Sequence, residues 1–291
     1  MKKVLILLFV LVCLGGALFA AGYWLDIFVE DGRLHAAKKS PAESHSVMHA
    51  ETFKTIEISA DSADIEVVRG DDYGFAYISS RGKTTGWSNE NGKLTIHQKN
   101  RSIFLNLAFL FGRNSIRVVV PASAGLTSTN IQVASGKITV SDIACAAIQT
   151  DAVSGNTTLD GIDVEVLKIS ATSGNIRLNN CRAGELEARL ISGNLDADAM
   201  DTVATDISLT SGNAAVAGNF LGSNKLTAVS GDITLLVDGQ KTKYNRKISV
   251  ISGSVTIDGV PTQSEIYENA SSKNAFDISV TSGNVRISFT G

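Results

Sequence analysis

The sequence has little of what most catalytic and metal-binding sites are built from. Only four of its 291 residues are histidines, and His35, His45 and His49 lie together in one polar stretch near the N-terminus. No carboxylate or cysteine spacing around them gives a closed set of ligands, so we expect neither a metal ion nor another cofactor. His97 is the only histidine near the main body of the chain, and no Cys-His or Ser-His-Asp arrangement can be assembled there. Nucleophilic catalysis is therefore disfavoured.

Cysteine, proline and aromatic residues are scarce as well. Three cysteines are too few for a framework of disulfides. Aromatic residues make up 6% of the chain and hydrophobic residues 44%, so the core must consist mainly of small and β-branched side chains, as in a narrow β-sheet interior. The net charge is −3, and no basic patch with interleaved aromatic residues occurs, which argues against nucleic acid as a partner.

What the sequence does contain is a repeat. A Ser-Gly pair recurs at five successive steps of 19 residues, and then after 22 and 30 residues. A fixed period near 20 with alternating apolar and polar residues is typical of a solenoid, in which each unit forms one coil stacked on the last. With two degenerate units nearer the N-terminus, the pattern predicts an all-β, single-stranded β-helix (β-solenoid) of about ten coils. The glycines at its predicted structural corners are Gly136, Gly155, Gly174, Gly193, Gly212, Gly231, Gly253 and Gly283.

The Ser-Gly pair marks a change of phase between two strands. Leu167, Ile169 and Ala171 alternate with other residues before the pair, whereas Ile176 and Leu178 alternate in the opposite phase after it. The chain must bend at Ser-Gly-Asn to keep both strands facing one interior, and glycine can adopt the positive φ that such a bend needs. The asparagine after most of these glycines should form a hydrogen-bonded ladder along the stacked coils. An anion-binding nest is the alternative for these corners.

The N-terminus predicts a membrane anchor. Residues 4–25 form a run of 22 residues without a charge, which is long enough to cross a bilayer as a helix. Lys2 and Lys3 precede it, which predicts that the repeat region lies outside the cell membrane. Residues 1–25 are thus predicted to be a signal anchor with one transmembrane helix. The alternative is a secreted chain, because residues 20–22 are also suitable as a signal-peptide cleavage site.

The remaining chain divides into three parts. Residues 26–52 are predicted to be a polar stalk, residues 53–129 degenerate coils with a cap, and residues 130–291 the regular solenoid. In the second part, residues 103–111 (IFLNLAFLF) are either a cap over the first coil or an apolar hairpin offered to a membrane or partner. The last strand stops at Gly291, so we expect an open edge that lets chains associate through the solenoid ends.

The outward position before each repeat serine is a candidate binding face. It holds small and β-branched side chains, with no nucleophile, base or metal ligand; packing beneath the corner is the alternative. A flat ladder of such residues suits contact with a partner, because catalysis needs titratable groups that converge in a cleft. The residues chosen for this face are Val153, Thr172, Ile191, Thr210 and Val229.

The charged residues are better explained by contacts between coils than by catalysis. One outward column of the predicted stack consists of Lys168, Glu187, Asp206 and Lys225. Opposite charges become neighbours in this column, which predicts cross-strand ion pairs. Asp196 and Asp198 would be the carboxylates of a polysaccharide-active β-helix enzyme, but Asp196 occupies the outward position that Arg177 fills one coil earlier.

The Ser-Gly-Asn-Ile units, together with residues 62–67 and 115–121, resemble the putative-adhesin β-strand-repeat family of bacterial envelope proteins. This is a domain of unknown function, and its members include membrane-anchored LiaG-type proteins. The resemblance runs from about Phe53 to the C-terminus. It implies a β-helical fold, an envelope location and an adhesin role, and it supplies no catalytic residues.

These observations lead to one functional hypothesis and two alternatives. We expect a non-enzymatic adhesin, envelope-binding or scaffold module that is attached to the membrane by its N-terminal helix. Its expected partner is an envelope glycan or another envelope protein. The alternatives are a polysaccharide-active β-helix enzyme and a self-assembling envelope scaffold.

Overall fold

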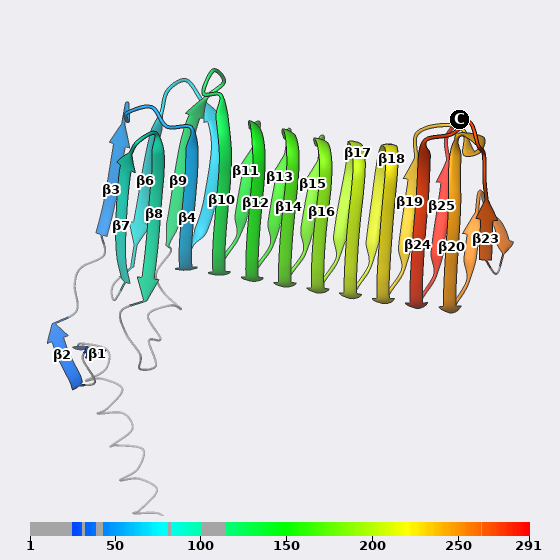
Figure 1. The fold of residues 1–291 in the computed structure, drawn as a ribbon. Coiled ribbons are helices and arrows are strands. Elements are labelled where there is room, and N and C mark those ends of the chain that lie inside the picture. The colour runs from blue at the N-terminus through cyan, green and yellow to red at the C-terminus, as the bar shows by residue number, and fades with distance from the viewer. Residues whose placement is uncertain (1–24, 31–32, 39–42, 81–82, 101–113, 263) are drawn as a thin grey trace, which may run out of the picture.

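A computed structural model describes residues 25–30, 33–38, 43–80, 83–100, 114–262 and 264–291 (Figure 1). All but the last residue of the predicted membrane-crossing segment, residues 4–25, lies outside this part of the chain, and so does the apolar run 103–111. Within the described ranges, no helix is both long and apolar enough to span a bilayer.

The described chain is almost entirely β-strand. Strands β1 (Leu25–Glu30) and β2 (Arg33–Lys38) form a two-stranded antiparallel sheet, and the other 23 strands form one continuous sheet. These are β3 (Glu43–Met48), β4 (Thr55–Ser62), β5 (Asp64–Gly70), β6 (Gly74–Ser79), β7 (Lys83–Glu90), β8 (Lys93–Asn100), β9 (Ser115–Pro121), β10 (Leu126–Ser135), β11 (Ile138–Ser141), β12 (Ala144–Ser154), β13 (Thr157–Asp160), β14 (Asp163–Ser173), β15 (Ile176–Asn179), β16 (Arg182–Ser192), β17 (Leu195–Ser211), β18 (Ala214–Ser230), β19 (Ile233–Val237), β20 (Tyr244–Ser252), β21 (Val255–Ile257), β22 (Val260–Thr262), β23 (Ser264–Tyr267), β24 (Asn274–Ser282) and β25 (Val285–Phe289). A short 3-10 helix, η2 (Lys241–Lys243), precedes β20.

From β10 to β19 the strands stack as coils in parallel register (Figure 1). Ala144 of β12 lies opposite Asp163 of β14, which in turn lies opposite Arg182 of β16. Each step is one 19-residue repeat, so the chain returns to the same position after every coil. A long strand such as β14 and a short strand such as β15 meet at each Ser-Gly-Asn corner. The all-β prediction is confirmed, and the 19-residue parallel register is that of a β-solenoid.

The core fills the narrow space between the long and short strands. Ile169 and Ala171 of β14 and Ile176 and Leu178 of β15 are all at most 3% exposed. Both strands therefore face one interior, although their apolar residues alternate in opposite phase. No aromatic residue occurs between positions 126 and 214, because small and β-branched side chains already fill this space.

At the C-terminal end, the order of the coils in space differs from their order in the sequence. Strand β24 lies between β18 and β20, with Ser282 opposite both Ser230 and Ser252. Likewise β25 pairs with β19 on one side and β21 on the other. The prediction that the last strand forms an open edge is therefore wrong. Strands β20 and β21 form the outermost coil, and β24 and β25, which come later in the sequence, lie between that coil and β18 and β19. Antiparallel β23 and β22 cover that outermost coil.

The N-terminal end shows a similar exchange. Strand β4 pairs in parallel with both β10 and β8, and β5 pairs with both β11 and β9, so the first coil lies inside the second. Antiparallel β7 covers β8, β6 covers β9, and β3 pairs with β6. Because β3 lies within residues 26–52, this strand of the predicted polar stalk is part of the sheet.

Candidate binding face

The Ser-Gly-Asn corners hold the face in place. The eight corner glycines have φ between 128° and 146°, a region that residues with a Cβ rarely adopt. A Cβ on Gly174 would also overlap the backbone carbonyl oxygen of Gly155 in the preceding coil. Both the conformation and the close stacking of the coils therefore require glycine.

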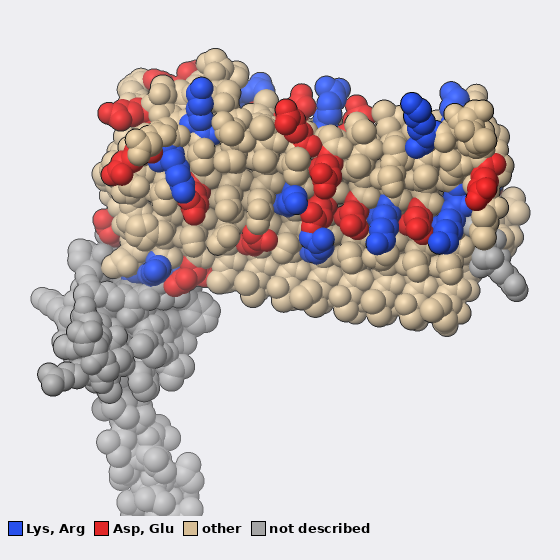
Figure 2. Space-filling model, viewed as in Figure 1, with Lys and Arg blue, Asp and Glu red and all other residues tan. Residues whose placement is uncertain are grey.

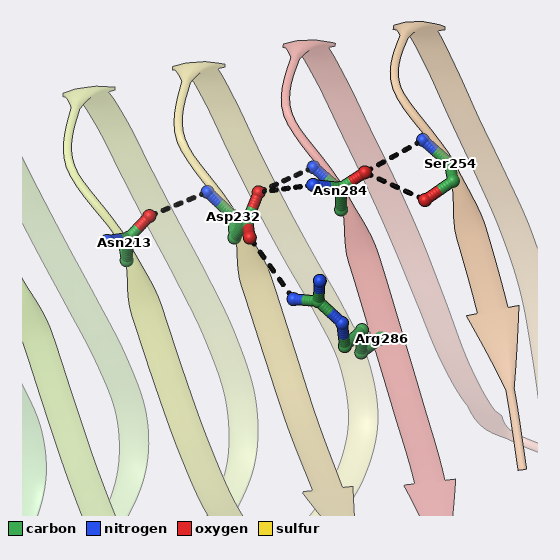
Figure 3. A network of polar contacts seen from close by, with 5 residues as sticks. All are labelled: Asn213, Asp232, Ser254, Asn284 and Arg286. Atoms are coloured by element: carbon green, nitrogen blue, oxygen red, sulfur yellow. Dashed lines mark hydrogen bonds and ion pairs between the residues drawn. The ribbon is translucent and has the colours of Figure 1, made fainter. Parts of the chain in front are cut away.

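The residue after each glycine joins neighbouring coils. The backbone N–H of Asn175 donates to Asn156 Oδ1 at 2.9 Å, and that of Asn194 donates to Asn175 Oδ1 at 3.0 Å. The same pattern continues through Asn213, Asp232, Asn284 and Ser254, as Figure 3 shows for the C-terminal coils. At the same corners, the Gly155 N–H donates to the carbonyl of Ser173 in the next coil at 3.0 Å. These N–H groups already donate hydrogen bonds to the neighbouring coil, so the ladder is structural. They are therefore not available to bind an anion, as the alternative of an anion-binding nest would require.

Asp232 is the carboxylate of this ladder among the C-terminal coils (Figure 3), and Asp64 plays the same part at the N-terminal end, where it accepts the Lys137 N–H at 2.9 Å. Asp232 accepts hydrogen bonds from the Asn284 backbone N–H at 2.8 Å and the Asn284 side-chain amide at 3.0 Å, and from Arg286 Nη1 at 3.1 Å. Burial raises the pKa of Asp232, but these donors and the Arg286 charge together lower it further, so the pKa lies below its ordinary value. Asp232 is thus ionised at neutral pH and stabilises the neighbouring coil, which contains Asn284 and Arg286.

The predicted binding residues lie side by side on the outward surface of the long strands. Val153, Ile191 and Val229 are each 55% exposed, and Thr172 and Thr210 are exposed between them. None of the five packs beneath a corner. Because Ser282 stands between Ser230 and Ser252, the column continues with Thr281 and then Ile251, which is 80% exposed. We call these seven residues the corner ridge: Val153, Thr172, Ile191, Thr210, Val229, Thr281 and Ile251.

In space, aliphatic and threonine residues alternate along the whole corner ridge. In sequence order the alternation fails at the end, since Ile251 follows Val229 directly and Thr281 comes last. The inserted coil restores it. Since strands in a sheet lie about 4.8 Å apart, each residue type recurs at about 9.6 Å.

A second outward column on the same strands is charged. It consists, in spatial order, of Gln149, Lys168, Glu187, Asp206, Lys225, Asp277 and Lys247, and its last six members are the charged row. The predicted cross-strand pairing is confirmed for Lys168 and Glu187, which approach to 3.2 Å, and Arg189 also contacts Glu187. Figure 2 shows charges of both signs side by side across the middle of this surface, with an uncharged band at the ends of the long strands.

The column between the corner ridge and the charged row carries mostly hydroxyl groups. It contains Ser170, Ser208, Thr227, Ser279 and Ser249, with Asp151 and Arg189 as its charged members. We call the three columns together the long-strand face. It is flat, lined by short side chains along one edge and charged along the other.

The carboxylates of the alternative enzyme lie on the other side of the corner, in the first residues of β17, which pair with the short strand β15. Asp196 and Asp198 border an open groove of about 300 Å³ whose floor includes Ala215 and Ala217. Asp196 is 3.7 Å from the guanidinium of Arg177, and Asp198 Oδ1 accepts the Ala199 N–H at 3.0 Å. Across the described ranges, no three His, Cys, Asp or Glu side chains are grouped so that they could hold a metal ion.

The two cysteines of the solenoid are buried free thiols. Burial raises the pKa of Cys181 to about 11, and burial raises the pKa of Cys145 as well. Only the thiolate is a nucleophile, so both groups remain unreactive thiols at neutral pH. They contribute packing to the core.

Comparison with known proteins identifies the family to which this chain is similar. A family model described as Toastrack DUF4097 matches residues 53–288. A solved putative adhesin from Bacteroides fragilis is 13% identical, with 85% of this chain and 96% of that chain covered and a TM-score of 0.51. A putative adhesin from Parabacteroides distasonis is 12% identical, with coverage of 86% and 97% and a TM-score of 0.43. Among curated proteins, none matches the sequence. The resemblance to a putative-adhesin family is confirmed.

Proposed function

The chain belongs to the Toastrack family, and we propose that it is a non-enzymatic binding module of the cell envelope. Its long-strand face contacts the partner, and its N-terminal segment anchors it to the membrane. The corner ridge carries this proposal, because four aliphatic side chains on it are at least 55% exposed along one line. An exposed apolar row is costly in water unless something covers it. The similar Bacteroides fragilis protein is named a putative adhesin, which supports a role in contact.

The chemistry of the surface supports binding over turnover. The corner ridge holds no acid, base or nucleophile, and Asp196 and Asp198 in the first residues of β17 each have a partner of their own. The anchor rests on residues 4–25, which carry no charge and follow two lysines. An anchored module of this kind meets its partners in the envelope.

The test is to incubate the full-length chain, purified in detergent, with cell-wall glycans and with membrane fractions, while following retention and product release. We expect retention without turnover, weakened by Val153→Lys and by Ile191→Lys. Leu236→Lys is the matched control, because Leu236 is 44% exposed on the short-strand side. Release of saccharide that is lost in an Asp196→Asn, Asp198→Asn variant would instead identify an enzyme.

A further inference from the structure

We propose that the partner of the long-strand face is a second copy of this chain. The two copies pack face to face about a twofold axis that runs parallel to the strands and passes through the coil of Thr210. This inference rests on the proposed function, because it takes the long-strand face as the binding surface. The partner that binds there is an identical chain, so the contact is homophilic. Such an axis reverses the order of the coils in the second copy and keeps the direction of its strands.

The corner ridge is self-complementary under this operation. It has seven members, and the axis through the fourth brings the first onto the seventh. Aliphatic residues then meet aliphatic residues, and threonines meet threonines. The facing pairs are Val153 with Ile251, Thr172 with Thr281, Ile191 with Val229, and Thr210 with Thr210. The match depends on the inserted coil, since the alternation of the ridge exists only in the spatial order.

The charged row is complementary under the same axis. Lys168 comes opposite Asp277, and Glu187 comes opposite Lys225. Each of these pairs occurs twice in the dimer, which gives four contacts between opposite charges. Packed sheets lie about 10 Å apart, a distance that lysine, glutamate and aspartate side chains can bridge between them. Complementary charges of this kind favour one register over others.

Other positions of the axis fit less well. An axis between two coils places aliphatic residues against threonines. An axis through the coil of Val229 brings Asp206 opposite Asp277 and Lys225 opposite itself. An axis through the coil of Ile191 brings Glu187 opposite itself. It also places Ala134 of β10 opposite Thr281, and Asp61 of β4 opposite Ile251. The axis through the coil of Thr210 therefore matches the whole ridge, and the charged row is compatible with it.

One contact in the proposed register is unfavourable. Asp206 lies in the coil of Thr210 and so faces its own copy across the axis. Like charges that face each other oppose association. Removing this charge should therefore favour association, so we expect Asp206→Asn to strengthen the dimer.

The face is large enough for a specific dimer. Seven strands at about 4.8 Å cover roughly 34 Å, and six residues at about 3.3 Å cover roughly 20 Å. Each copy would bury roughly 680 Å², or about 1,400 Å² in total, which lies within the range of stable protein interfaces.

Sedimentation equilibrium of the full-length chain in density-matched detergent tests the proposal. We expect a concentration-dependent mass of two chains. Asp277→Lys and Lys168→Glu should each weaken association by about tenfold, because each replaces two attractive contacts with repulsive ones. An equimolar mixture of these two variants should associate as the parent does, since the introduced charges then face each other. Asp206→Asn should tighten the dimer, and Leu236→Lys should leave it unchanged.

The outcomes separate this inference from the proposed function. A monomer at all concentrations, a mixture that stays monomeric, or a dimer insensitive to the face variants would overturn the inference. Circular dichroism of each variant keeps a folding defect from being taken for lost association. If the monomeric chain is still retained by envelope fractions, the proposed function stands and its partner is another molecule. If the chain dimerises but no envelope fraction retains it, the proposed envelope binding is wrong and the homophilic contact stands.

Discussion

A single methyl group can test how closely the coils are stacked. Gly174 has a φ of 140°, and a Cβ there would overlap the carbonyl oxygen of Gly155. Gly174→Ala therefore adds backbone strain of about 1–3 kcal/mol. It also forces two coils apart, which as overpacking costs about 1–3 kcal/mol more. We expect the free energy of unfolding to fall by about 4 kcal/mol in total.

Gly92 provides the matched control. Its φ is 72°, yet nothing lies within 4 Å of an added Cβ. Gly92→Ala thus carries backbone strain alone, about 1–2 kcal/mol. Asn175→Ala should cost about 1 kcal/mol, because it removes only the acceptor of the Asn194 N–H.

Urea unfolding of the full-length variants, followed by far-ultraviolet circular dichroism, measures these differences. The expected order of destabilisation is Gly174→Ala first, with Gly92→Ala and Asn175→Ala well below it. Equal losses for the two glycine variants would refute the reasoning, because strain alone would then explain both. In that case the contact between Gly174 and Gly155 would not limit the stacking of the coils.

Two ionisable side chains allow further tests. Because the folded pKa of Asp232 lies below its ordinary 3.8, the stabilisation it provides is complete above that pH and is lost as pH falls through the folded value. Melting temperatures of the parent should therefore fall more steeply below pH 3.8 than those of Asp232→Asn, and parallel curves would contradict this. Cys181, whose pKa is about 11, should resist alkylation near neutral pH in the folded chain and react after unfolding, as peptide mass mapping would detect; equal labelling in both states would contradict its burial.

The interior of the solenoid could be predicted because the repeat specifies it position by position. Ile169 and Ile176 are apolar in opposite phases around a Ser-Gly pair, and a bend at the pair is the arrangement that buries both. The ladder could be predicted in the same way, since an asparagine follows most of the corner glycines. Its donors are mainly backbone N–H groups, which the sequence does not distinguish from side-chain amides.

The order of the end coils could not be predicted. Steps of 22 and 30 residues indicate longer connections, but they are equally compatible with a coil added in order and with one inserted later. Strand β24 can enter between β18 and β20 because residues 258–273 are long enough to carry the chain around the outermost coil. The spacing of the repeats gives only the number of residues between successive corners. It does not say which strands pair, and the order of the end coils depends on that pairing.

Two departures from asparagine in the ladder, at positions 232 and 254, follow from that exchange. Each ladder side chain accepts the N–H of the coil that comes next in space. Ser254 lies on the outermost coil, where its backbone N–H and its hydroxyl both donate to Asn284 Oδ1. No further coil of the ladder follows it, so its side chain does not have to accept an N–H. Asp232 is followed in space by the coil of Asn284 and Arg286, and its second oxygen meets Arg286. A carboxylate is favoured there because the next coil brings a guanidinium, and that coil is next only through the insertion of β24 and β25. The residues at positions 232 and 254 and the alternation of the corner ridge are thus all consistent with the spatial order of the coils rather than with their order in the sequence.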